Sequence, residues 1–392
     1  MVPSPPLHDP AWWAGDPYPA FAELRAHDPV HRYEGEAGEL WMITRHADVQ
    51  AISRDPTTFC SGEGVLLTDI TRPALANESI IQLDPPRHAR HRKLVSPSLT
   101  VRRVAQLEDR VRSIARGLLD DLDPTEVVDA VDRIAVPLPI TVIAELVGVP
   151  PADLPDFRRW SDAAIAAATE ATDEVIALTG ELYGYIGALV RARQAESRDD
   201  LVSVLAHGRV DGEALSDADI DMFVLTLLVA GNETTRSLIA NGLHALAAHP
   251  DQRRRLVADP ALVASGVEEL LRWEAPIMSF CRTATRPVEV AGTAIAAGDP
   301  VLLCYQSANR DERAFGPTAD RLDVGRDPNP HLSFGYAEHY CLGAGLARLE
   351  GRILFEELLA RWPAYEPAGD IERVPSRLAR GVVHLPLVLD PS

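Results

Sequence analysis

Cys341 lies where the sequence passes from a turn-rich stretch, residues 327–330, into a helix expected from about Gly343 to Arg361. The first turn of a helix carries unpaired amide N–H groups and a partial positive charge, and both favour a thiolate over a thiol. Gly343 would let backbone amides approach the sulfur, and Phe334 would shield it from water. A thiolate in this setting could bind a metal. The simpler alternative is a buried structural cysteine at a helix start.

A second group that could do chemistry is the run AGNETT, residues 230–235, which holds Glu233 next to Thr234. It lies midway along the longest expected helix, which starts after Ser216 as N-cap and ends near His249. Gly, Asn and Thr are weak helix formers, and a threonine hydroxyl can bond to the carbonyl one turn back and bend the helix. An acid beside a hydroxyl can relay protons. A helix kink without chemistry is the alternative.

A third group consists of residues that could bind carboxylates. His88 and Arg92 are four residues apart on a helix opened by Pro85-Pro86, so they share a face. Together with Arg282 and His339 they offer the charged donors that carboxylates prefer. For His88 and Arg92 the alternative is an ordinary basic surface run.

Taken together, these motifs resemble those of the cytochrome P450 family. The run 230–235 is similar to the family's sequence of a small residue, Gly, any residue, an acid and Thr. At one position of the loop the family usually has Gly, which eases a tight turn, and this chain has Ala337. The loop matches the family's haem-binding pattern at Phe334, Gly335, His339, Cys341 and Gly343.

The resemblance covers essentially the whole chain and implies a haem b cofactor with Cys341 as the proximal iron ligand. A thiolate ligand pushes electron density onto haem iron and promotes O–O cleavage. The resemblance also implies that Thr234 and Glu233 supply protons for that cleavage, and that Ala230 and Gly231 face the haem. The expected propionate ligands are His88, Arg92, Arg282 and His339.

A structural role is expected for Glu269 and Arg272, which lie one helical turn apart. In the family, a Glu and an Arg at this spacing join a later Arg to brace the core behind the haem loop. The later residue is expected to be Arg321.

Substrate-binding residues are expected by analogy with the family alone. They should come from residues 65–81, from the helices between 151 and 195, and from residues 223–228 and 277–280. These stretches are mainly apolar, with Arg72 as an exception, so we expect a neutral lipophilic substrate such as a steroid, terpenoid or polyketide. The side chains expected to line the pocket are Val65, Leu66, Leu67, Phe223, Leu227, Ile277, Met278 and Phe280.

These residues are positioned by a mainly helical chain with a smaller β-rich part. Apolar residues recur at helical spacing from about Pro85 to Ala248, and short strand-like runs appear elsewhere. We expect one domain spanning residues 1–392 with the cytochrome P450 fold, in which haem lies between a long distal helix and a proximal Cys loop. The strand-rich minor part should comprise roughly residues 29–60, 281–304 and 370–390.

The formal net charge is −20, from 38 basic and 58 acidic residues, which argues against nucleic acid or an anionic membrane as the main partner. The N-terminus lacks the features of a signal peptide, no apolar run reaches the length of a membrane helix, and the four cysteines are not spaced as a disulfide framework. A cytoplasmic protein is expected.

No Gly-rich nucleotide-binding turn is present, so electrons should come from a separate ferredoxin or flavodoxin with its reductase. The expected docking residues are the basic cluster Arg87, Arg90, Arg92, Lys93, Arg102 and Arg103.

The expected function is a haem-thiolate monooxygenase that hydroxylates a lipophilic molecule with dioxygen and two electrons. Two other classes would use Cys341 in the same loop. A haem-thiolate sensor or carrier has no use for Glu233 and Thr234. A peroxide-driven peroxygenase needs no proton relay for dioxygen. The presence of both relay residues favours the monooxygenase.

Overall fold

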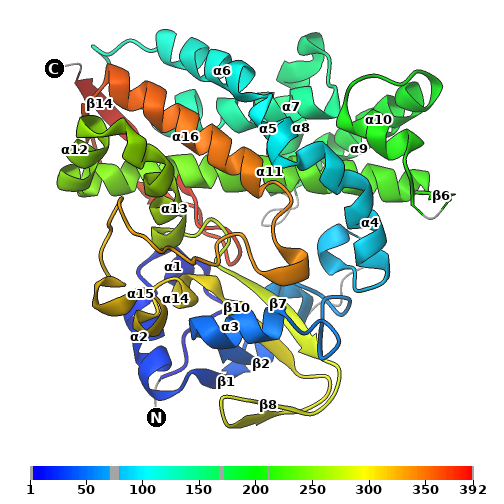
Figure 1. Ribbon diagram of the computed structural model, residues 1–392, viewed down its shortest axis with the longest axis vertical. Helices are drawn as coiled ribbons and strands as arrows, with labels where there is room; N and C mark the ends of the chain where they lie inside the picture. The colour runs from blue at the N-terminus through cyan, green and yellow to red at the C-terminus, as the bar shows by residue number, and fades with distance from the viewer. Residues whose placement is uncertain (1–2, 71–78, 167–171, 211, 391–392) are drawn as a thin grey trace.

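The structure is a computed structural model that describes residues 3–70, 79–166, 172–210 and 212–390. A long helix, α11 (Asp217–Ala248), crosses the middle of the molecule (Figure 1). The Ser216 hydroxyl accepts a hydrogen bond from the Asp219 amide, and the Asp219 carboxylate accepts one from the Ser216 amide. This capping box fixes the helix start. His249 ends the helix before Pro250, so both ends agree with the sequence prediction.

Other helices surround α11, and the predicted helical character of residues 85–248 is confirmed. The α-helices are α1 (Pro10–Ala14), α2 (Tyr18–His27), α3 (His46–Ser53), α4 (Arg87–Val95), α5 (Val101–Ala105), α6 (Glu108–Asp120), α7 (Pro137–Val147), α8 (Leu154–Ala166), α9 (Asp173–Ala195), α10 (Leu201–His207), α11, α12 (Pro250–Ala258), α13 (Val263–Trp273), α14 (Tyr305–Ala308), α15 (Glu312–Phe315) and α16 (Ala344–Arg361).

The main sheet joins two segments that are far apart in the sequence and lies with the N-terminus in the lower part of Figure 1. Its strand order is β1-β2-β10-β7-β3, with β10 parallel to β2 and the other neighbours antiparallel. Arg282 lies on β7 opposite Val301 of β10, so the sheet fixes its position. These strands are β1 (Val30–Gly35), β2 (Gly38–Ile43), β3 (Phe59–Cys60), β7 (Ser279–Ala284) and β10 (Pro300–Cys304).

Within the part of the chain that the structure describes, the strands near the C-terminus do not join the main sheet, although residues 370–390 were expected in one strand-rich minor part with residues 29–60 and 281–304. In the described residues, β14 pairs with β11 and β4 beside the helices, and β12 pairs with β13. The remaining strands are β4 (Val128–Asp129), β5 (Arg209–Val210), β6 (Glu213–Ala214), β8 (Val288–Val290), β9 (Thr293–Ile295), β11 (Ala364–Pro367), β12 (Glu372–Arg373), β13 (Val382–His384) and β14 (Pro386–Asp390).

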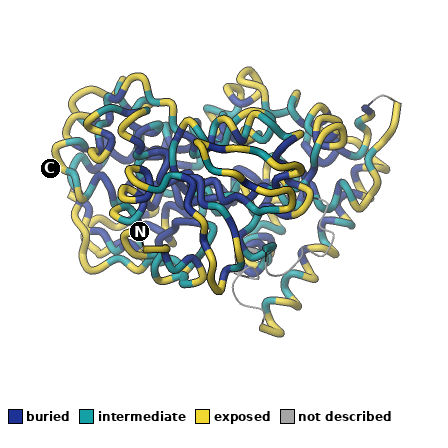
Figure 2. The backbone as a smooth tube through the Cα atoms, turned by 90° about the horizontal axis from the view of Figure 1, so that it is seen from below, coloured by how far each residue is buried: buried dark blue, intermediate teal, exposed yellow. Residues whose placement is uncertain are grey.

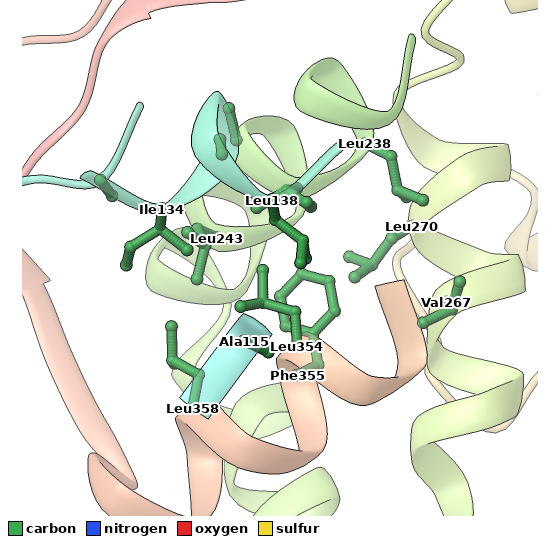
Figure 3. Packing of buried hydrophobic residues seen from close by; sticks show 14 of the residues in the cluster. Ala115, Ile134, Leu138, Leu238, Leu243, Val267, Leu270, Leu354, Phe355 and Leu358 are labelled. Carbon is green, nitrogen blue, oxygen red and sulfur yellow. The ribbon is translucent and has the colours of Figure 1, made fainter. Parts of the chain in front are cut away.

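The core behind the Cys341 loop forms where α11, α13 and α16 meet (Figure 3). Phe355 of α16 is 1% exposed and packs with Leu270 of α13 and Leu238 of α11. A Cβ added to Gly242 of α11 would lie 2.7 Å from the Phe355 ring, so only glycine permits this close helix approach. Burying one such aromatic side chain contributes roughly 1.5–3 kcal/mol. The helix that follows Cys341 is therefore rigidly held.

Burial follows the same arrangement over the whole molecule. Buried backbone runs through the middle of the view in Figure 2, and exposed segments lie mostly around its edge. Among the residues that the structure describes, one helix, α9, is long and apolar enough to cross a membrane by length and composition, and 28% of its apolar stretch is buried. A single helix of this kind is weak evidence for a membrane span, and α9 packs against α8, α10 and α11.

Candidate functional site

The loop that carries Cys341 is held by its own backbone. The Cys341 amide donates a hydrogen bond to the Phe334 carbonyl at 2.8 Å. Gly335 and Ala337 both adopt left-handed backbone conformations, with φ of 68° and 56°. Glycine adopts this conformation without strain, so Ala337 occupies a position that favours glycine. A Cβ on Gly343 would lie 3.9 Å from the Cys341 Sγ atom, so this glycine leaves the helix start close to the sulfur.

Opposing effects act on the Cys341 sulfur. The residue is accessible to solvent, yet the dense protein around the sulfur raises the pKa of its thiol. The amides of Gly343 and Ala344 and the charges of Arg92 and Arg348 act in the opposite direction. The helix start therefore favours the thiolate, as the sequence predicts, but does not offset burial by itself. A bound metal cation would stabilise the thiolate directly.

A network behind the loop includes residues that were not predicted from the sequence. Arg348 of α16 forms two hydrogen bonds to the Glu268 carboxylate, at 2.7 and 2.9 Å, and one to the Tyr340 hydroxyl at 2.8 Å. Its guanidinium carbon lies 4.4 Å from the centre of the Phe334 ring. Burial opposes ionisation of Glu268, but hydrogen bonds from His331 and Arg348 outweigh it and lower its pKa to about 2. Spacing in the sequence could have indicated Arg348, because it follows Cys341 by about two helical turns.

Glu269 and Arg272 form the buried pair that the sequence predicts, with side chains 0% exposed. The third residue is Arg326, whose Nε lies 3.1 Å from the Glu269 carboxylate. The prediction of Arg321 is wrong: its side chain is exposed, and only its carbonyl accepts hydrogen bonds, from Arg272 and Arg326. The loop that follows Arg321 turns the side chain of Arg326 toward Glu269. Asn329 also donates to Glu269, at 3.1 Å.

The middle of α11 borders accessible space. Ala230 is exposed although the helix crosses the core, and the Thr234 hydroxyl donates to the Ala230 carbonyl at 2.6 Å. This is the back-bonded threonine expected from the sequence. A Cβ on Gly231 would instead lie 3.4 Å from Ile143 of α7. The position where a side chain would project from Gly231 therefore faces α7. A cofactor on the Ala230 side could contact Gly231 only through its peptide backbone.

Glu233 faces a different neighbourhood from Thr234. Its carboxylate lies 3.5 Å from Arg236, and its side chain is 12% exposed. Burial raises the pKa of Glu233, Arg236 lowers it and Asp162 of α8 raises it further. The acid and the hydroxyl are thus adjacent in sequence but lie on separate faces of α11. A water molecule or a side-chain rotation must connect them.

The four expected carboxylate-binding residues gather beside the Cys341 loop. The rings of His88 and His339 lie 4.2 Å apart, and Arg282 is 6% exposed. Burial and Arg92 lower the pKa of His88 to about 4. Burial, Arg282, His88 and Arg92 lower the pKa of His339 to about 3. The two imidazoles are therefore neutral hydrogen-bonding groups at neutral pH, and Arg92 and Arg282 supply the positive charge that two carboxylates would offset.

This donor set fits a haem. Cys341 offers a sulfur ligand on one side, Ala230 and Thr234 lie on the long helix, and the cationic cluster suits two propionates. Ligand atoms of His88, Glu338 and His339 lie within 4.8 Å of one another, a spacing that could also hold a metal ion. The nearby arginines oppose an added cation, so carboxylates fit this cluster better.

The expected substrate-lining residues divide into two sets. The Cys281 amide donates to the Val65 carbonyl at 2.7 Å, which brings residues 65–67 beside residues 277–280. The partly exposed members are Leu66, Leu227, Ile277 and Phe280. Buried in packing with exposures of 1–6% are Val65, Leu67, Phe223 and Met278. Arg72 and residues 71–78 and 167–171 lie outside the described residues.

A comparison with known proteins identifies the class that this fold and site define. A sequence profile described as Cytochrome P450 matches residues 154–386. The chain is also 40% identical over 383 residues to "Vitamin D(3) 25-hydroxylase" of Pseudonocardia autotrophica, covering 96% of this chain and 94% of that protein. The chain belongs to the cytochrome P450 family. It is an oxidoreductase, a monooxygenase that incorporates an oxygen atom from dioxygen and works with haem iron.

Other relatives agree in sequence and in fold. "Cytochrome P450 monooxygenase PikC" of Streptomyces venezuelae is 40% identical, covering 96% of this chain and 91% of that protein. The solved structure of cytochrome P450 CYP109Q5 from Chondromyces apiculatus is 38% identical, with a TM-score of 0.87, and the match covers 97% of each chain. The structure of CYP268A2 of Mycobacterium marinum in complex with pseudoionone is 36% identical, with a TM-score of 0.88 over 99% of this chain and 100% of that one.

Proposed function

We propose that Cys341 is the proximal ligand of haem b in a monooxygenase that hydroxylates a neutral lipophilic molecule. The observation that carries this proposal is the accessible Cys341 at a helix start, close to the charge of Arg92. The next residue, Leu342, packs against the buried cluster that includes Leu228 of α11. Haem iron supplies the binding and reduction of dioxygen. His88, Arg92, Arg282 and His339 would hold the propionates.

The protein's own residues would control protons and water. The Thr234 hydroxyl, oriented by its hydrogen bond to Ala230, would direct protons toward bound dioxygen. Glu233, buried and held near Arg236, would supply them from the opposite face of the helix. Phe334, at 9% exposed, and the Arg348 guanidinium over its ring would exclude water from the sulfur.

A steroid, terpenoid or polyketide is the proposed substrate class. Support comes from the partly exposed Leu66, Leu227, Ile277 and Phe280, which are all apolar. The relatives' names point the same way, since they include hydroxylases named for vitamin D(3) and mycinamicin IV. A related structure, 30% identical with a TM-score of 0.86, contains testosterone.

Electrons are proposed to come from a ferredoxin or flavodoxin with its reductase, acting in the cytoplasm. Arg102 and Arg103 on α5 are exposed, and no ion pair is recorded for either in the described part of the chain. Arg87 and Arg90, in contrast, form ion pairs with Asp219 and Glu213. Among the basic residues predicted to dock the partner, Arg102 and Arg103 are therefore the best candidates.

The ligand assignment is tested by the spectrum of the reduced protein with carbon monoxide. The parent should show the strongly red-shifted Soret band of thiolate-ligated haem, and Cys341→Ser should lose it. Cys60→Ser, which changes a half-buried cysteine elsewhere, should keep it. A red-shifted band in Cys341→Ser would exclude Cys341 as the ligand.

Assays of product formation with the same protein distinguish the monooxygenase from the sensor and the peroxygenase. The monooxygenase should need reductant and dioxygen to form product. A sensor would form no product under any condition, and a peroxygenase would form product from hydrogen peroxide without reductant.

A further inference from the structure

The carboxyl group of Glu233 meets a part of the chain that the sequence does not suggest. Ser237 lies one turn further along α11, and Gly381 precedes β13. A Cβ built on Gly381 would lie 3.2 Å from the Ser237 Oγ atom and 3.4 Å from the Glu233 Oε1 atom. These three residues therefore meet at one place, between α11 and the β12–β13 hairpin.

Two buried oxygens at this place make no hydrogen bond of ordinary geometry among the described residues: Glu233 Oε2, which has Arg236 at 3.5 Å, and Ser237 Oγ. Ser237 nevertheless lies close enough to the Glu233 carboxyl group to lower its pKa. Ser237 is 1% exposed, so bulk solvent does not satisfy its hydroxyl. It also lacks the hydrogen bond to the preceding turn that Thr234 makes. Leaving a buried polar group unpaired costs about 1–3 kcal/mol. Such groups in folded proteins are normally linked by an ordered water.

Gly381 leaves room beside the Ser237 hydroxyl and the Glu233 carboxyl group. An added methyl group would press on Ser237 and Glu233, and it would also lie 3.1 Å from Val374. On the other side, Arg236 contacts the Glu233 carboxylate at 3.5 Å. The carboxylate is thus held between a charged partner and an unused hydroxyl.

We propose that Ser237 is a further proton-relay residue, which feeds Glu233 from the side of the β12–β13 hairpin. The Ser237 hydroxyl passes its proton to Glu233 Oε2, directly or through one water, and takes a proton from water on its other side. No net charge stays on the serine. Gly381 is a positioning residue that keeps this place open. This inference rests on the proposed role of Glu233 as the acid of the relay.

The test compares Ser237→Ala, Gly381→Ala and Ser237→Thr in the haem-loaded protein, after the carbon monoxide spectrum and thermal midpoint confirm folding. Oxygen consumption is measured in H₂O and D₂O. The alanine variants should slow it about tenfold and raise the solvent isotope effect. This is less than the roughly 10²–10⁴-fold effect of losing a group that transfers the proton to substrate, because water can partly replace a more distant relay group. Ser237→Thr keeps a hydroxyl and should restore the parent rate.

A second readout does not depend on turnover. The infrared carboxyl band that disappears in Glu233→Gln belongs to Glu233, and it should shift in Ser237→Ala and Gly381→Ala. The control is Ser203→Ala, which removes a buried hydroxyl from α10, outside the site. It should change neither the band nor the rate.

The outcomes separate the two proposals. Parent behaviour in Glu233→Gln would overturn the role of Glu233 itself. A slow Glu233→Gln with parent rate and band in Ser237→Ala would overturn only the role of Ser237. Equal slowing in Ser203→Ala, or failure of Ser237→Thr to restore the rate, would also overturn it.

Discussion

Thr234 and Glu233 show how much one position along a helix changes the chemistry of a side chain. Successive residues of α11 point about 100° apart, so the hydroxyl turns back to Ala230 while the acid meets Arg236 and Gly381. The two side chains therefore act at different points of one path, and their loss should have different consequences.

Thr234→Ala should keep haem binding and oxygen consumption but release hydrogen peroxide in place of part of the hydroxylated product. The reason is that protons still reach the site through Glu233, but the Thr234 hydroxyl no longer directs them. Glu233→Gln should slow oxygen consumption itself, because Glu233 acts earlier in the relay and the supply of protons then fails. Product and peroxide per reductant consumed give the measurement. A Thr234→Ala variant as tightly coupled as the parent would refute this mechanism.

Ala337 carries backbone strain at a single residue. A left-handed conformation costs a non-glycine residue roughly 1–2 kcal/mol, and glycine gives back part of that through its more flexible unfolded chain. Ala337→Gly should therefore raise the free energy of unfolding by about 0.5–1 kcal/mol, seen as a higher thermal midpoint. Ala347→Gly, inside α16, should lower it by about 1 kcal/mol. Equal effects of the two changes would contradict this account.

At the scale of elements, α13 is tied to the loop before Cys341 through Glu269. Arg326 donates to that carboxylate and to the carbonyls of Phe315, Thr318 and Arg321, all within 3.3 Å. Removing one partner from such a buried group is strongly destabilising, because the remaining charge and acceptors stay buried without compensation.

Arg326→Met should cost about 3 kcal/mol of unfolding free energy, because it leaves buried acceptors unpaired. Arg321→Met, the matched control, should change it by less than about 0.5 kcal/mol. Denaturant titration measures both. Similar losses in the two variants would show that the assignment of Arg326 is wrong.

Glu350 of α16 gives a pH dependence at the same scale. Burial raises its pKa from the usual 4.5 to about 8, and its Oε2 atom has no partner among the described residues. A raised carboxyl pKa means that the unfolded chain ionises first. Between pH 4.5 and 8 the folded state should therefore lose stability as pH rises, by at most about 1.4 kcal/mol per unit.

Glu350→Gln should remove this slope. The measurement is the unfolding free energy of parent and variant at several pH values from 5 to 8, with the difference growing toward pH 8. A difference that stays constant across this range would mean that Glu350 is already ionised in the folded protein.

At the scale of the whole molecule, the net charge of −20 makes any exposed basic patch stand out. Arg102 and Arg103 directly follow Val101 in the sequence, and Val101 is 86% exposed. A cationic surface with an apolar neighbour suits an acidic electron-transfer protein, and steering of this kind weakens with salt.

Charge reversal at Arg102 and Arg103 should slow reduction by the partner at low salt and flatten its salt dependence. Arg198→Glu, at an exposed arginine on another part of the surface, should have little effect. Stopped-flow reduction at several ionic strengths measures both. An unchanged rate at low salt in the double reversal would remove Arg102 and Arg103 from the docking surface.

The sequence by itself determined the features that depend on neighbours within about one helical turn. Ser216 and Asp219 set the start of α11, and Pro250 follows its end, because capping is local chemistry. The spacing around Cys341 indicated the ligand loop for the same reason. Glu269 and Arg272 had to meet because they share a helix face.

Only the tertiary structure decided which distant residues complete these groups. Arg326 rather than Arg321 reaches Glu269, since the loop path sets which side chain turns inward. Gly381 meets Ser237 across 144 residues of sequence because β13 packs beside α11. The number of such pairings open to a chain is large, and the packing of the whole core selects among them.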